Sequence, residues 1–152
     1  MRIRKFTPSD LQAIQHLFHD TVHAINAKDY SPKQIDTWAP KTPSATWDTI
    51  QENICIVAEI NGTIVGFGDV TEKGYVDRLY THKDFQNLGI GSQILKRLEH
   101  HARQLGLKEV YTESSITAKT FFERHGYILL KSQKKTFRGT NFQNYVMLKS
   151  LA

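Results

Sequence analysis

The chain has 152 residues, of which 39% are hydrophobic and 23% charged, which predicts one globular domain with a sizeable core. Its net charge of +5 suits an anionic ligand such as a polyphosphate, but its basic residues are too scattered for the dense, aromatic-interleaved stripe that favours nucleic-acid binding. No apolar run approaches the roughly 20 residues of a membrane span, no signal-peptide core follows the basic N-terminus, and the single cysteine, Cys55, excludes an internal disulfide. We therefore expect a cytoplasmic protein without a membrane partner, with Cys55 as a small buried hydrophobe.

The N-terminal third predicts a strand followed by helices. Residues 2–6 alternate polar and apolar side chains, as a half-buried strand does. Pro8 and its polar neighbours then begin a helix whose apolar residues recur at steps of three and four as far as Ile25. Prolines at the start of the next two segments predict short helical stretches over 33–38 and 44–51.

The middle of the chain predicts a hairpin, a further strand and a long helix. Two apolar runs, 54–60 and 63–70, are joined by Asn61-Gly62, a strong hairpin signal. A strand is expected over 75–81. Residues 90–105 carry an amphipathic helical pattern that ends at Gly106, which predicts a C-cap there.

The C-terminal third predicts one more strand and helix, then a hairpin. The strand spans 108–114 and the helix spans 116–125, which Gly126 ends. Two last strands, 127–137 and 142–148, are joined by a turn over 138–141. With no repeat or linker in the sequence, we expect one α/β domain over 1–152, a sheet with helices on both sides.

The most informative segment is the loop Gln86-Asn87-Leu88-Gly89-Ile90-Gly91 at the start of the long helix. Helix N-termini leave backbone N–H groups unpaired at the positive end of the dipole, which suits phosphate, and glycines let a ligand approach the backbone. A tight turn before an ordinary helix is the alternative. A dinucleotide fingerprint fits poorly because a third glycine is missing, and a P-loop is excluded because no Gly-Lys-Ser/Thr follows.

Two segments together resemble the GNAT superfamily of N-acetyltransferases, and the resemblance covers nearly the whole chain. Residues 79–91 resemble its fourth strand and cofactor loop, through Gln86-x-x-Gly89-x-Gly91. Residues 118–127 resemble its Ala-x-x-Phe-Tyr landmark before a Gly–aromatic step, and with residues 29–38 they also resemble the YafP-like subgroup of small bacterial acetyltransferases. The resemblance implies a single-domain α/β fold: a central mixed, mostly antiparallel sheet of about seven strands, splayed between strands 4 and 5, with helices on both faces.

The family's cofactor is acetyl-CoA, so the resemblance implies a coenzyme A site. The pyrophosphate would lie on the glycine loop and the pantetheine arm beside the fourth strand, where a backbone N–H would hold the thioester carbonyl. The implied cofactor-binding residues are Leu79, Tyr80, Thr81, Gln86, Asn87, Leu88, Gly89, Ile90, Gly91, Ser92, Ser114 and Ala118.

The chain departs from the family at its usual general acid. The tyrosine of Ala-x-x-Phe-Tyr is Phe122 here, and a phenyl ring cannot donate a proton. Either another residue, such as Tyr80 or Tyr127, protonates the leaving thiolate, or water does. The alternative is a protein that binds acyl-CoA but transfers the acyl group poorly.

Strand alternation offers candidates for the base. Tyr75, Asp77 and Leu79 would share one face, and Val76, Arg78 and Tyr80 the other. Tyr75 falls where some family members carry a glutamate base, Asp77 faces the same way and is the better base, and Glu113 in the next strand is a second carboxylate. The catalytic candidates are therefore Asp77, Tyr75, Glu113 and Tyr80; each could instead be a polar group at a strand end.

The segment between the first and third strands varies in the family and would bind the acceptor. His23, Tyr30 and Trp38 lie there and, with Tyr75, are the expected substrate residues. The aromatic side chains would line a compact pocket for a small molecule, or they would pack the helices onto the sheet. His16, His19 and His23 recur on one helical face, but without a fixed fourth ligand we expect no metal.

Three functions remain open. The first is acetyl-CoA-dependent N-acetylation of a small-molecule amine by direct attack on the thioester. The second is an acyl-CoA-binding module with weak catalysis, which Phe122 favours. The third is acetylation of protein amines or aminoacyl-tRNA, which the basic charge favours. The strands of the C-terminal hairpin would be exposed, so a homodimer is also compatible with the sequence.

Overall fold

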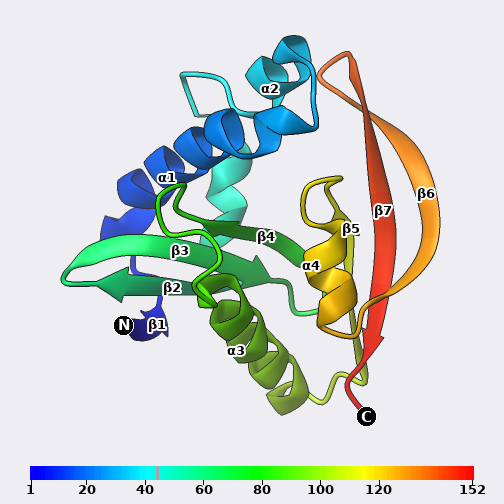
Figure 1. Ribbon diagram of the computed structural model, residues 1–152. Coiled ribbons are helices and arrows are strands. Elements are labelled where there is room, and N and C mark those ends of the chain that lie inside the picture. Colours follow the sequence, from blue (N-terminus) through cyan, green and yellow to red (C-terminus); the bar gives the residue numbers. More distant parts are fainter. Residues whose placement is uncertain (44) are drawn as a thin grey trace.

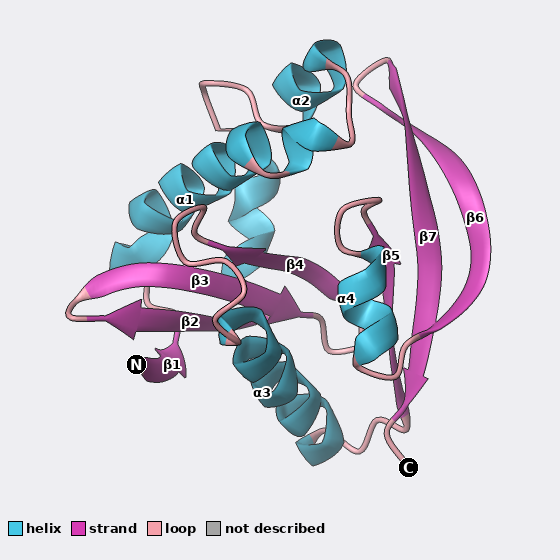
Figure 2. Ribbon diagram, in the orientation of Figure 1, coloured by secondary structure: helices cyan, strands magenta, loops and turns pink. Residues whose placement is uncertain are grey.

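The seven strands of the computed structural model, which describes residues 1–43 and 45–152, form two neighbouring sheets (Figures 1 and 2). The elements, in chain order, are β1 (Arg2–Lys5), α1 (Leu11–Ala24), α2 (Pro32–Trp38), β2 (Ile54–Ile60), β3 (Thr63–Val70), β4 (Val76–Thr81), α3 (Ile90–Gln104), β5 (Glu109–Ser114), α4 (Lys119–Arg124), β6 (Ile128–Phe137) and β7 (Thr140–Ser150). Three short 3₁₀ helices accompany them: η1 (Pro8–Asp10), η2 (Asn26–Lys28) and η3 (Ala45–Gln51).

The two sheets touch at one end and diverge at the other. The first has the order β1-β2-β3-β4 and the second β5-β7-β6, all antiparallel. A parallel bridge, Tyr75 to Tyr111, joins them, and the Thr112 hydroxyl donates to the Val76 carbonyl at 2.8 Å. Beyond this point β4 and β5 part, which confirms the predicted splay between the fourth and fifth strands.

Alternation along β2 separates two hydrophobic cores. Ile56 and Ala58 face α3, whereas Cys55 and Val57 face α1 and η3. The helix α3 packs close to β3 because Gly66 has no side chain; a Cβ there would lie 2.8 Å from the Ile94 side chain. Helices on both faces are therefore confirmed, as is the burial of Cys55. In the described part of the chain, no helix is both long and apolar enough to cross a membrane.

Two hairpin turns follow the same backbone rule. Asn61 and Gly62 have φ of 51° and 80°, the left-handed pair that a two-residue turn needs. Arg138 and Gly139 repeat this pair with φ of 49° and 77°. The four-residue turn predicted over 138–141 is therefore wrong, and β7 begins at Thr140.

The helical segments near residues 116 and 44 differ slightly from their predicted ranges. The helix expected from residue 116 begins at Lys119, since the Ser115 hydroxyl accepts from the Ala118 N–H at 3.0 Å and holds the chain in a turn before the helix. The helical stretch expected over 44–51 appears as η3, and Ser44 lies outside the described residues.

A β-bulge in β4 changes which side chains share a face. Arg78 pairs with Asp69 and Val76 with Val70, so Asp77 is an extra residue in β4. Val76 therefore packs in the α3 core, against which Leu79 also packs, while Tyr80 packs on the α1 side. The strict alternation predicted through Asp77 is wrong, because a bulge resets the two-residue period.

Candidate active site

A cleft of about 960 Å³ opens where β4 and β5 diverge. The start of α3, the loop before α4 and the β6–β7 hairpin complete its walls. Every predicted catalytic residue lines it, and so does every predicted cofactor residue except Leu88, whose side chain is exposed to solvent. Of the predicted substrate residues, Tyr30, Trp38 and Tyr75 line it and His23 does not.

The glycine loop forms an open cradle at the N-terminus of α3. Asn87 and Gly89 are both left-handed, with φ of 60° and 81°, which turns the chain sharply into the helix. Apart from Gly89 and its two chain neighbours, no atom of the described residues lies within 4 Å of the position that a Cβ on Gly89 would take. Gln86 fixes the start of the loop, because its amide donates to the Thr81 carbonyl at 2.7 Å. Because the first N–H groups of a helix have no intrahelical partner, this open cradle fits a diphosphate.

His125 joins this cradle from the end of α4. Its Nδ1 lies 2.8 Å from the Phe121 carbonyl oxygen and its Nε2 lies 2.9 Å from the Ser92 hydroxyl. A carbonyl only accepts, so Nδ1 carries the proton and, in the neutral ring, Ser92 donates to Nε2. Sequence reasoning missed His125, although it lies within the 118–127 segment that resembles the family.

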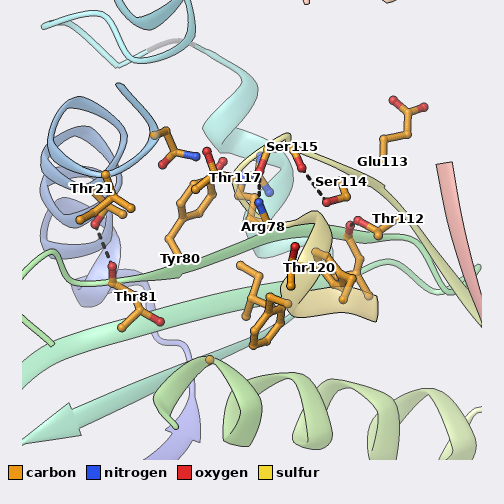
Figure 3. Close-up of a pocket in the computed structure, with 18 of the residues that line it drawn as sticks. Thr21, Arg78, Tyr80, Thr81, Thr112, Glu113, Ser114, Ser115, Thr117 and Thr120 are labelled. Carbon is orange, nitrogen blue, oxygen red and sulfur yellow. Dashed lines mark hydrogen bonds between the residues drawn. The ribbon is translucent and has the colours of Figure 1, made fainter. Parts of the chain in front are cut away.

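The splay exposes backbone groups along one edge of β4. The His82 N–H donates to the Val65 carbonyl at 2.8 Å, so in this antiparallel pair the backbone of His82 points to β3. By the two-residue period, the backbone N–H and C=O of Leu79 and Thr81 point away from β3, toward β5. The Thr81 carbonyl accepts from Thr21 at 3.0 Å (Figure 3).

Phe122 takes the place of the tyrosine that the resemblance to the acetyltransferases implies. It is only 4% exposed and packs in the α3 core, with its ring centroid 5.0 Å from that of Tyr127. Tyr127 does not line the cleft; its hydroxyl donates to buried Glu99 at 2.8 Å. Tyr127 is therefore too far removed from the cleft to act as a replacement acid.

Asp77 lies at the bulge beside a buried ion pair. Arg78 binds Asp69, which is 0% exposed, at 2.6 Å and approaches Asp77 at 3.5 Å. Burial raises the pKa of Asp69, and Arg78 and Asn53 oppose that shift. Arg78 also lies over the Trp47 ring, 5.1 Å from its centroid. Asp77 itself is exposed, which suits a group that exchanges protons with a ligand or water.

The second candidate carboxylate is engaged by a cation. Both Glu113 oxygens accept from the Lys135 ammonium, at 2.8 and 2.7 Å. Tyr75 lines the cleft and packs on Tyr111, with ring centroids 5.1 Å apart. Burial raises the pKa of Tyr75, helped by Asp77 and Glu113. A neutral Tyr75 suits proton donation rather than the role of a base.

Tyr80 lies on the α1 side of β4. Its ring packs on Phe18 and Phe67, at centroid distances of 4.9 and 5.7 Å. Burial raises the pKa of Tyr80, although the nearby Arg78 opposes this. Figure 3 shows Tyr80 and Arg78 rising from the same side of the strand. Tyr80 therefore carries its proton at neutral pH.

A second cavity of about 910 Å³ lies against the first, between α1, α2 and the β6–β7 turn. The two cavities share five residues, and these mark their junction: Trp38, Asp77, Arg78, Tyr80 and Phe137.

Two histidines of α1 contact each other and the backbone. The rings of His19 and His23 stack 4.2 Å apart, and His23 bonds the Ala39 carbonyl at 2.8 Å. Across residues 1–43 and 45–152, no group of three or more His, Cys, Asp or Glu side chains is arranged to hold a metal ion.

Comparison with known proteins agrees with this geometry. A family model described as an acetyltransferase (GNAT) domain matches residues 26–149. The chain belongs to the GNAT family of acetyltransferases. YafP of Escherichia coli (strain K12), named as an uncharacterized N-acetyltransferase, is 33% identical over 147 residues, 97% of this chain and 94% of that protein. This GNAT protein is therefore an N-acetyltransferase, and acetyl-CoA is the acetyl donor of its family.

Solved structures show the same fold. A GCN5-related N-acetyltransferase from Rhodopseudomonas palustris superposes with a TM-score of 0.94 at 26% identity, covering 99% of this chain and 95% of that one. The PaiA N-acetyltransferase of Thermoplasma acidophilum, solved in complex with coenzyme A, has a TM-score of 0.77 at 19% identity, with 98% of each chain covered. The single-domain GNAT fold predicted from the sequence is thus confirmed.

Proposed function

We propose that this protein transfers the acetyl group of acetyl-CoA to the amine of a small molecule by direct attack on the thioester. The observation that carries the proposal is one continuous cleft that joins the open cradle at Gly89 to the exposed carboxylate of Asp77. Phosphate recognition and proton transfer are thereby available in the same cavity, along the same exposed edge of β4.

The cofactor would lie along the predicted residues. The N-terminal N–H groups of α3, from Gly89 to Ser92, would bind the diphosphate. The pantetheine arm would pair with the backbone of Leu79 and with the Thr81 N–H, between β4 and β5, since the Thr81 carbonyl already accepts from Thr21 and Gln86. The Leu79 N–H would donate to the thioester carbonyl and stabilise the charge that develops on its oxygen.

The acceptor amine would reach the thioester from the side of Asp77. Acetyl-CoA supplies an activated acyl carbon: a bond forms from the amine nitrogen to this carbon, and its bond to sulfur breaks. Asp77, directly or through water, would take the proton that the nitrogen loses. Tyr80 or Tyr75, both kept neutral by burial, would donate a proton to the departing thiolate, or water would do so. No covalent enzyme intermediate is needed, in keeping with the burial of Cys55.

Two alternatives have specific support. Phe122 favours an acyl-CoA-binding module with weak catalysis, since the usual acid is missing. The net charge of +5 favours a macromolecular acceptor. A polymer needs an open groove, whereas the acceptor side of this cleft has aromatic side chains on it, including Tyr30 and Trp38, which supports a small molecule.

The test is a thiol-release assay with acetyl-CoA and a panel of small amines, run beside calorimetric titration with coenzyme A. We expect both amine-dependent thiol release and binding of coenzyme A. Tight binding of coenzyme A without thiol release for any amine would favour the acyl-CoA-binding module. Release only with a peptide or aminoacyl-tRNA acceptor would favour the third function.

A further inference from the structure

An aromatic box stands where the two cavities meet. We define it by five rings from α2, β4, β6, β7 and the segment before α2: Tyr30, Trp38, Tyr80, Phe137 and Phe142. The Trp38 ring is central, with centroid distances of 5.2 Å to Tyr30, 6.3 Å to Phe142 and 6.5 Å to Tyr80. Phe137 lies 6.3 Å from Phe142. Residues as far apart in sequence as 30 and 142 thus form one wall.

The rings of the box keep part of their surface exposed within the cavities. Four rings are half-buried, and Phe137 is 37% exposed with the Arg138 guanidinium 4.6 Å from its ring centroid. Other large apolar side chains of the same region, such as Phe67, are 0% exposed. Partly exposed aromatic rings that line a concave site favour a ligand with a flat apolar body, because stacking adds to the gain from area burial.

The charges beside the box favour a single amine. The guanidinium of Arg78 lies 2.6 Å from Asp69 and 3.5 Å from Asp77, so the exposed carboxylate of Asp77 already has one cation beside it. The other carboxylate of the first cleft, Glu113, is engaged by Lys135. Lys41 and Arg138 also line the second cavity, which makes a polycation a poor fit.

From these contacts we infer that the acceptor is a primary amine on an aromatic body, an arylalkylamine, with its ring in the aromatic box and its nitrogen between Asp77 and Leu79. Asp77 lines the junction of the two cavities together with Trp38, Tyr80 and Phe137, so a short alkyl linker would join the aromatic ring to the nitrogen. The inference rests on the proposed function, because it names the acceptor of the same site.

The test compares matched amines. The probes are 2-phenylethylamine, its saturated counterpart 2-cyclohexylethylamine, and spermidine. Two readouts are taken: kcat/KM with saturating acetyl-CoA, and calorimetric affinity for each amine on the enzyme saturated with coenzyme A. We expect phenylethylamine to exceed the cyclohexyl compound by about threefold to tenfold in both, as stacking predicts. Spermidine should be the poorest probe.

Two variants test whether the aromatic box causes the preference for the aryl amine. Trp38→Leu and Phe142→Leu should each remove the preference for the aryl amine and leave the affinity for coenzyme A unchanged. Tyr145→Leu is the matched control, because Tyr145 lies on β7 like Phe142, is half-buried and lines neither cavity. Tyr145→Leu should keep the preference. Thermal melting of each variant checks that it is folded.

Different results would contradict the arylalkylamine acceptor and the proposed acetyl transfer. If amines are acetylated but spermidine is preferred, or if the aryl preference survives both Trp38→Leu and Phe142→Leu, the arylalkylamine inference is wrong and the proposed function stands. If no amine is acetylated but phenylethylamine binds preferentially and loses that preference in both variants, the acceptor class stands and the proposed function fails.

Discussion

The imidazole Nε2 of His125 lies 2.9 Å from the hydroxyl oxygen of Ser92, so the end of α4 is bonded to the first turn of α3. The same ring is fixed on its other side by the Phe121 carbonyl, 2.8 Å from Nδ1. Ser92 belongs to the helix start that is proposed to bind the diphosphate. The orientation of its hydroxyl is therefore set by a residue 33 positions away in the sequence.

His125→Phe should weaken the binding of acetyl-CoA by about fivefold to tenfold, the equivalent of roughly 1 kcal/mol. The variant keeps a ring beside Phe121 but removes both hydrogen bonds. Calorimetry with acetyl-CoA and with S-acetyl-pantetheine, which lacks the diphosphate, measures the effect. The affinity for S-acetyl-pantetheine should not change; an equal loss for both ligands would mean a general distortion. His100→Phe, at an exposed position on α3, is the control.

Gly89→Asp should abolish measurable binding of coenzyme A, a loss of at least about 100-fold, because it sets a carboxylate against the diphosphate. Gly106→Asp is a matched control at the other end of α3. Both glycines have φ of 81°, and for neither does a described residue other than its chain neighbours come within 4 Å of the Cβ position. Each variant should lose roughly 1 kcal/mol of stability from backbone strain. Only Gly89→Asp should lose the ligand, and equal affinities of the two variants would refute the cradle.

Asp77→Asn should lower kcat by about 100-fold, the usual contribution of a general base. The affinity for coenzyme A should change by less than about twofold, because the amide keeps the size of the side chain. Steady-state kinetics beside calorimetry separates the two quantities. Asp36→Asn, at an exposed position on α2 outside both cavities, should leave both unchanged. Weakened coenzyme A binding with normal kcat would instead make Asp77 structural.

Tyr127→Phe should lower the free energy of unfolding by about 1–2 kcal/mol and leave kcat unchanged. The reason is that the Tyr127 hydroxyl donates to Glu99, a carboxylate only 3% exposed that Lys149 also binds at 2.9 Å. Urea denaturation and the thiol-release assay measure the two effects. A large fall in kcat at full stability would return Tyr127 to the list of candidate acids.

Stability should fall at alkaline pH. Burial raises the pKa of Tyr75, Tyr80, Tyr127 and the Cys55 thiol. The folded state therefore keeps protons that the unfolded state releases above about pH 8.5 for cysteine and about pH 10 for tyrosine. The unfolded state then binds fewer protons, so the free energy of unfolding decreases as pH rises, by up to about 1.4 kcal/mol per pH unit for each group.

Urea denaturation between pH 7 and pH 11 measures this slope. Below about pH 8 these four groups should contribute no pH dependence. Tyr127→Phe should give a shallower slope above pH 10, because one of the four groups is removed. A slope identical to that of the wild type would show that Tyr127 ionises equally in both states.

Local patterns predicted most elements because they depend on near neighbours in the chain. The steps of three and four that mark α3, and the Asn61-Gly62 turn, involve only a few adjacent residues. The β6–β7 turn was harder to read, because Arg138 takes a left-handed φ of 49° that arginine rarely adopts. Phe142 opens the predicted last strand, but nothing beside it in the sequence indicates that it faces Tyr30.

The sequence by itself determined the family and predicted the cofactor loop and the absence of the usual acid, since Gly89, Gly91 and Phe122 are informative from their own neighbours. Only the tertiary structure decided how the site is arranged. The bulge that turns Asp77 out, the pairing of Glu113 with Lys135 and the aromatic box all depend on contacts between separate elements. Such contacts are set by the packing of whole sheets and helices, and a periodicity of two or 3.6 residues carries no information about them.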